Sequence, residues 1–155
     1  MDDLRFDELY SIKEEKGISL YLSITPNIGK KEILSTSKKL IESVKDKIQT
    51  EDKDYFEKSK DNLLNYIEGL RVKGKSLFLF VTPKNAYEFF YEFPLRNEII
   101  FGKPNFYQFY WAQIENPPFG VVNFKEDKFS FYKVLFLKEK LIFEEAPKVD
   151  TSTWR

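Results

Sequence analysis

Lysine side chains recur after residue 29 at a spacing that could assemble a phosphate-binding surface. Lys31, Lys38 and Lys45 are seven residues apart, so on a helix they would lie along one side. Such a row can contact RNA, because each lysine that neutralises a phosphate releases a counterion. The nucleic-acid-binding candidates on this segment are Lys30, Lys31, Lys38, Lys39 and Lys45. Acidic residues are interspersed among them, so a solvated helix face is the alternative.

A second basic group surrounds Gly74, immediately before an apolar run. It contains Arg71, Lys73 and Lys75, of which the two lysines are further nucleic-acid-binding candidates. The alternative is structural, since cations near a helix C-terminus offset its negative end by about 0.3–1 kcal/mol each.

Residues 106–111 contain five aromatic side chains in six positions, a pattern compatible with a strand or a short helix. In a strand, Tyr107, Phe109 and Trp111 would share one face, and we predict these three as a partner-binding surface. Burial in the core or at a domain interface is one alternative. Stacking on single-stranded bases is another.

The chain contains neither histidine nor cysteine. Disulfides, thiol nucleophiles, histidine-based triads and the usual zinc sites are therefore excluded, and carboxylates remain as the conventional general bases. The acids considered for a metal-dependent nuclease are Glu126, Asp127, Glu144, Glu145 and Asp150. Two of them belong to an expected hairpin tip that would point into water, whereas Mg²⁺ needs carboxylates converging in a concave site. We therefore predict no enzyme, cofactor or metal.

Overall charge and hydropathy favour a soluble cytoplasmic protein. The 155 residues include 25 basic and 25 acidic side chains, so no global positive field favours nucleic acid. The longest apolar run, Leu77–Val81, is far shorter than the ~20 residues that span a bilayer. The N-terminus has no signal-peptide pattern.

Periodicity predicts helices in the first half of the chain and strands in the second. After a short opening helix around Leu9, we expect a strand at 18–24, a helix of roughly 20 residues from Lys30, and a second helix from Glu51 to near Gly74. Further strands are expected at 76–82, 87–93, 98–101, 119–124, 129–136 and 141–145. Asn116-Pro117-Pro118 is the clearest linker signal.

These elements predict an α+β fold with two parts. Residues 1–115 would form a mixed sheet covered on one face by two long helices, and residues 118–155 a short antiparallel β segment. Three short strands cannot enclose a core alone, and their edges are open for pairing. The segment would dock on the first part, pair with a second copy in a homodimer, or continue into a longer protein.

The order of these elements resembles the N-terminal domain of the archaeo-eukaryotic release factors and Pelota, and their bacterial relatives most of all. The stretches that carry the resemblance are Gly17–Leu22, Gly74–Phe80, Glu92–Leu95 with Phe106, and Phe119–Phe124, the last resembling the start of the middle domain. The resemblance implies a ribosome- or tRNA-associated domain.

Two departures from the family pattern limit what this resemblance implies. The helix–helix turn should carry the codon-reading Asn-Ile-Lys-Ser, but Gln49–Asp54 is acidic and would be repelled by mRNA phosphates. The Gly-Gly-Gln loop for peptidyl-tRNA hydrolysis is missing through Arg155. We therefore expect a non-catalytic, RNA-associated domain of a release-factor-like protein, with a protein-interaction module using the aromatic surface as the alternative.

Overall fold

The computed structural model describes residues 9–25, 27–125, 128–135 and 138–145. The chain divides into two compact units, residues 1–108 and residues 109–155. None of the helices in the described residues is long and apolar enough to cross a membrane.

The first unit is built on a four-stranded sheet of β1 (Gly17–Ser23), β2 (Ser76–Val81), β3 (Ala86–Tyr91) and β4 (Glu98–Gly102). The strand order is β3-β2-β1-β4, and every neighbouring pair is antiparallel. The expected α+β class is confirmed, but the expectation of a mixed sheet is wrong. Two successive helices return the chain to the end of β1 where it left, so β2 runs back along β1, whereas a single crossover helix would give a parallel pair.

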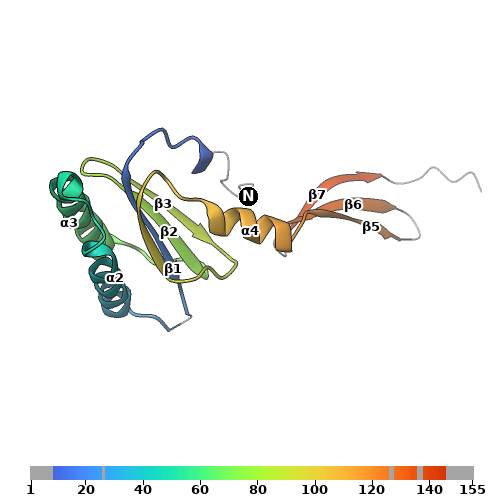
Figure 1. Ribbon diagram of the computed structural model, residues 1–155. Helices are drawn as coiled ribbons and strands as arrows, with labels where there is room; N and C mark the ends of the chain where they lie inside the picture. The colour runs from blue at the N-terminus through green and yellow to red at the C-terminus, as the bar shows by residue number, and fades with distance from the viewer. Residues whose placement is uncertain (1–8, 26, 126–127, 136–137, 146–155) are drawn as a thin grey trace, which may run out of the picture. The chain divides into compact units, whose positions relative to one another are not determined.

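Two antiparallel helices cover one face of this sheet (Figure 1). They are α2 (Lys30–Lys45) and α3 (Lys53–Gly69), and a 3₁₀ turn at Thr50–Asp52 precedes α3. Apolar side chains spaced by three or four residues point from both helices into the core, as amphipathic packing requires. The buried core comprises Ile18, Leu20, Leu22, Ile24, Ile33, Ile41, Phe56, Leu63, Ile67, Leu70, Leu77, Leu79, Val81 and Ile99.

The opposite face of the sheet is aromatic and is also covered. Tyr21 and Phe78 lie with ring centroids 4.8 Å apart, and Phe106 packs edge-on against Phe78 at 5.9 Å. The Tyr21 hydroxyl donates to the backbone carbonyl of Asn105. Burial on both faces explains why every residue of β2 is buried. The expected opening helix lies largely outside the described residues, although Leu9 is buried.

Gly74 shapes the basic segment that precedes β2. Its φ of 64° lies in the left-handed region, and an added Cβ would lie 2.7 Å from the carbonyl oxygen of Tyr91. The next residue, Lys75, donates its backbone N–H to that same oxygen at 2.7 Å. The backbone at Gly74 and Lys75 is therefore held against β3, and a side chain at residue 74 would disturb it.

The second unit contains a separate three-stranded antiparallel sheet of β5 (Phe119–Phe124), β6 (Phe129–Leu135) and β7 (Lys138–Glu145), in that order. α4 (Tyr107–Glu115) begins in the first unit and continues into the second. Phenylalanine side chains contact one another across the three strands, with Phe129 and Phe143 edge-on at 5.5 Å. A register shift at Phe131/Tyr132 interrupts the ladder between β6 and β7.

Candidate nucleic-acid interface

The predicted lysine row lies on the outer side of α2. Ile33, Ser37 and Ile41 recur every four residues and are buried beneath this helix. Burial of that stripe turns the opposite side outward, and the predicted lysines of α2 are all exposed. The helical spacing expected from the sequence is therefore confirmed, while a role in binding RNA stays a prediction.

The antiparallel arrangement of α2 and α3 brings the two predicted basic groups to one end of the helix layer. The Lys30 ammonium donates to the backbone carbonyl of Glu68, near the end of α3, at 2.8 Å. The segment that follows α3 lies beside the chain that precedes α2. The backbone N–H of Ile24 donates to the backbone carbonyl of Lys75 at 2.8 Å. The residues that we call the basic end are Lys31, Arg71, Lys73 and Lys75.

All four side chains of the basic end are exposed, and none forms an ion pair with another residue in the described part of the chain. Lys30 differs from them, since its hydrogen bond to Glu68 gives it a structural role at the end of α3. The four cations of the basic end are therefore exposed without an ion-pair partner among the described residues, although the Glu88 carboxylate lines the hollow beside Arg71 and Lys73.

A shallow hollow of about 440 Å³ opens beside Arg71 and Lys73. Its remaining lining residues are Asn65, Tyr66, Gly69, Leu70 and Glu88. Burial raises the pKa of Tyr66 to about 12, and a hydrogen bond to the Glu88 carboxylate makes a smaller contribution in the same direction. The Tyr66 hydroxyl is protonated at neutral pH, as an ordinary tyrosine is, and it donates its hydrogen to the Glu88 carboxylate.

The helix-end explanation accounts for only part of the basic end. α3 ends at Gly69 and has no basic residue in its last turn. The attraction between a cation and a helix C-terminus falls off within the last turn, so it applies to Arg71 at most. Lys73 and Lys75 lie beyond that range, so attraction to the C-terminus of α3 does not explain their positions.

The other predicted lysines do not join this cluster. Lys38 and Lys39 lie further along α2, and Lys45 lies at the opposite end, 3.8 Å from Glu42. An exposed pair of this kind contributes little to stability.

Acidic and basic side chains are interspersed at the opposite end of the helix layer. Asp52 pairs with Lys16 at 2.6 Å, and Asp54 pairs with Lys58 at 2.7 Å. The Gln49–Asp54 segment forms the turn between α2 and α3 and the start of α3, as the sequence predicts. The two ends of the helix layer therefore differ in pairing: acids and lysines form ion pairs at this end, whereas the cations of the basic end form none in the described part of the chain.

The aromatic segment is a helix, so the strand alternative for residues 106–111 is wrong. The Asn105 side chain accepts the N–H of Tyr107 at 3.1 Å, as a helix-capping residue does. In a helix Tyr107 and Trp111 lie one turn apart, while Phe109 points elsewhere and is buried. Phe109 is thus not available on an exposed surface. Tyr107 and Trp111 remain 38% and 58% exposed, and their role as a partner surface stays a prediction.

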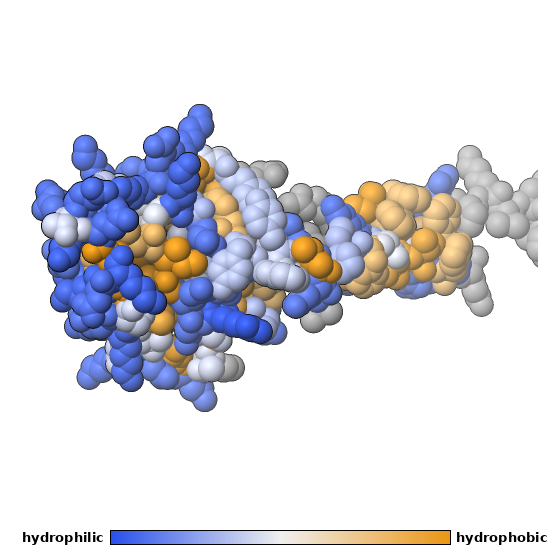
Figure 2. Space-filling view, viewed as in Figure 1, coloured by the Kyte–Doolittle hydropathy of each residue, from blue (hydrophilic) through white to orange (hydrophobic). Residues whose placement is uncertain are grey.

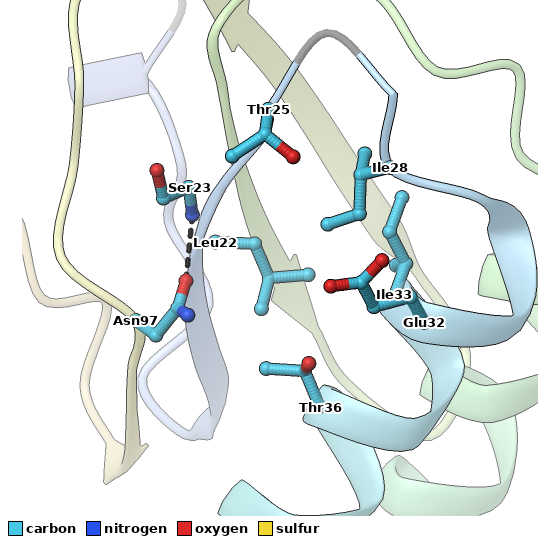
Figure 3. Close-up of a pocket in the computed structure, with 8 residues that line it drawn as sticks. All are labelled: Leu22, Ser23, Thr25, Ile28, Glu32, Ile33, Thr36 and Asn97. Atoms are coloured by element: carbon cyan, nitrogen blue, oxygen red, sulfur yellow. Dashed lines mark hydrogen bonds between the residues drawn. The ribbon is translucent and has the colours of Figure 1, made fainter.

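A second hollow, which we call the β1–α2 pocket, was not anticipated from the sequence (Figure 3). It has a volume of about 190 Å³ and lies between the end of β1 and the first turns of α2. Its lining residues are Leu22, Ser23, Thr25, Ile28, Glu32, Ile33, Thr36 and Asn97. Asn97 is more than 60 positions from the others in sequence, and no local motif joins them.

The carboxylates considered for metal binding are not assembled in the described part of the chain. Glu144 accepts hydrogen bonds from Lys128 at 3.0 Å and from Ser130 at 2.8 Å, and these bonds lower its pKa. The residues that the structure describes contain no group of three carboxylates close enough to hold a metal ion. Glu126, Asp127 and Asp150 lie outside the described residues.

No family model and no curated protein matches the chain. Among solved structures, the archaeal translation termination factor aRF1 matches with a TM-score of 0.47 and 14% identity, over 95% of this chain and 44% of that chain. A structure described as an archaeal protein matches with a TM-score of 0.45 and 13% identity, again over 95% and 44%. The chain therefore spans less than half the length of either structure.

Proposed function

We propose that this chain is a non-catalytic, cytoplasmic domain of a release-factor-like protein that associates with the ribosome or tRNA through its basic end. The observation that carries the proposal is the convergence of Lys31 with Arg71, Lys73 and Lys75 from two separate segments, all exposed and none paired with a described acid. The order of elements, which resembles the release-factor superfamily, adds to it.

RNA suits this surface because its phosphates are regularly spaced anions. Lysine and arginine supply most non-specific affinity for nucleic acid, since each contact releases a condensed counterion. At the opposite end the lysines are interspersed with acids such as Asp46 and Glu51, so that end offers RNA no comparable group of cations. RNA would therefore approach the basic end, away from the turn between α2 and α3.

Binding to purified ribosomes should weaken steeply with salt. If the four cations contact phosphates, each contributes about 0.7–0.9 to the slope of log K against log [KCl], giving a total slope of about −3. Cosedimentation of the full chain with ribosomes between 50 and 400 mM KCl measures this slope. No association at 50 mM KCl, or a slope near zero, would contradict the proposal.

Exposed apolar side chains in the second unit favour a second candidate function, protein–protein interaction. Phe124 and Phe119 on β5 are 77% and 56% exposed, and Leu141, Ile142 and Phe143 on β7 are also exposed. The space-filling view shows hydrophobic residues over much of this sheet (Figure 2). Patches of this kind mark interaction sites, and β5 is also an open sheet edge without a charged residue.

A homodimer through the edge of β5 is the specific form of this candidate that we test. Replacing Val122 by lysine places a charge on the edge strand, as natural proteins do to prevent edge pairing, and should shift dimer to monomer. Sedimentation equilibrium at 10–200 μM measures the change, with Asn123→Ser on the same strand as the control. A wild-type chain that is monomeric throughout this range would rule out the homodimer.

A further inference from the structure

The β1–α2 pocket combines an apolar floor with polar groups, several of which have no hydrogen-bond partner among the described residues. Leu22 and Ile33 are buried, and Ile28 is half-buried. Among the described residues, none forms a hydrogen bond or ion pair with the Glu32 carboxylate or with the hydroxyls of Thr25 and Thr36. A concave apolar site with a few convergent polar groups is the usual form of a small-ligand site.

Asn97 is oriented within this pocket by the end of β1. Its side-chain oxygen accepts the backbone N–H of Ser23 at 2.7 Å. This bond leaves the amide nitrogen as the outward donor, and no described residue accepts from it. In Figure 3 the Glu32 carboxylate points across the hollow toward Leu22, and Asn97 lies on the far side. The pocket thus offers an acceptor pair at one wall and a donor at the other.

We infer that the β1–α2 pocket binds an unpaired guanine base of single-stranded RNA. Guanine carries two adjacent donors, N1–H and N2–H, which a carboxylate such as that of Glu32 can accept together, as it accepts the two parallel donors of arginine. Its O6 and N7 are acceptors that could receive the Asn97 amide, and its flat face suits the floor formed by Leu22 and Ile33. This inference rests on the proposed association with RNA and names the base recognised beside the basic end.

The other bases fit the same groups less well. Adenine offers only one donor group on its Watson–Crick edge, the N6 amino group. The neighbouring N1 is an acceptor, so it would repel the second oxygen of the Glu32 carboxylate. Uracil presents a single donor between two carbonyl oxygens, which the same carboxylate would repel. Cytosine offers one donor group, its N4 amino group, beside the acceptor N3. Guanine alone presents two adjacent donors, one for each carboxylate oxygen.

An arginine side chain of a protein partner has the same two parallel donors, but the surrounding charge favours a nucleotide. Lys30 and Lys31 directly precede Glu32 in the first turn of α2, and Lys31 belongs to the basic end. These cations would attract the phosphates attached to a guanosine and would repel a guanidinium. The inference therefore commits to RNA, with an arginine peptide as an outcome of the test.

Binding of short RNAs to the full chain tests the inference. We expect the pentaribonucleotide UUGUU to bind at least tenfold more tightly than UUAUU, measured by calorimetry at 50 mM KCl. Free GMP should bind more weakly than UUGUU, because it lacks the flanking phosphates. Equal affinity for the two pentamers, or preferential binding of an arginine-containing peptide such as Gly-Arg-Gly, would overturn the inference. Equal affinity for GMP and UUGUU would overturn RNA as the source of the base.

Two variants separate the pocket from the basic end. Glu32→Gln removes the charge and one acceptor, and should abolish the preference for UUGUU while leaving binding of UUAUU within twofold. The control Glu42→Gln makes the same change on α2 outside the pocket and should keep the preference. If Glu32→Gln keeps the preference while binding still weakens steeply with salt, the inference fails and the proposed function stands. If neither RNA binds but GMP does, the proposed association with RNA fails.

Discussion

Reversing the charge of Lys31, Arg71 and Lys73 together is expected to weaken binding to ribosomes about a hundredfold at ~0.1 M salt. Each lost phosphate contact reduces the slope of log K against log [salt] by about 0.7–0.9, so three contacts reduce it by about two. Because 0.1 M is one decade below 1 M salt, a slope smaller by about two lowers the affinity at 0.1 M about a hundredfold. The three side chains are exposed, so their replacement by glutamate should leave the core intact. Cosedimentation across a KCl series measures both the affinity and the slope.

The matched control places the same change of charge at the opposite end of the helix layer. Lys47→Glu, Lys53→Glu and Lys58→Glu are changes at exposed positions, and the triple variant has the same net charge as the first. It should bind within about threefold of the wild-type chain. Equal losses in both variants would mean that net charge alone attracts the RNA, and that the basic end is not a defined interface.

Replacing Phe56 by alanine is expected to destabilise the first unit by about 3–5 kcal/mol, the range measured for buried phenylalanine. Phe56 is buried on α3, and its ring packs edge-on against that of Phe101 with centroids 5.3 Å apart. The loss combines the burial of the ring, the cavity left behind and the aromatic pair. Because domains are stable by only about 5–15 kcal/mol, much of the folding free energy depends on this side chain.

Urea unfolding followed by circular dichroism measures this effect. With a slope of about 1–3 kcal/mol per molar urea, the midpoint should fall by about 2 M. Lys53→Ala in the first turn of the same helix serves as the control and should change stability by no more than about 0.5 kcal/mol. A loss below about 1 kcal/mol for Phe56→Ala would contradict the packing of α3 on the sheet.

Local pattern predicted most elements of the first unit. The alternation at residues 18–24 and the helical spacing after Lys30 correspond to β1 and α2, because each period is read from neighbouring residues alone. Residues 106–111 were ambiguous between a strand and a short helix, because only neighbouring residues could be compared. A run of aromatic residues fits both the two-residue period of a strand and the 3.6-residue period of a helix. The structure adopts the helix, and the Asn105 side chain caps its start.

The candidate sites were predicted less completely than the fold. The lysines were identified by type and spacing, but Lys31 and Lys73 are 42 positions apart, and no sequence period says that they share an end. The β1–α2 pocket was missed altogether, because Asn97 reaches it from the segment before β4. Phe109 was predicted as a partner-binding residue, with burial as the alternative, and it is buried because helical geometry turns it away from Trp111.

By itself, the sequence determined which chemistries are available to this protein and where most of its helices and strands lie. The absence of histidine and cysteine, the lysine spacing and the apolar periods are properties of residues close along the chain. Only the tertiary structure decided that the sheet is antiparallel throughout, that Lys30 reaches the end of α3, and that Glu32 and Asn97 line the same hollow. The physical reason is that proximity between distant residues depends on which ends of the elements pack together, and burial of the whole core selects that arrangement.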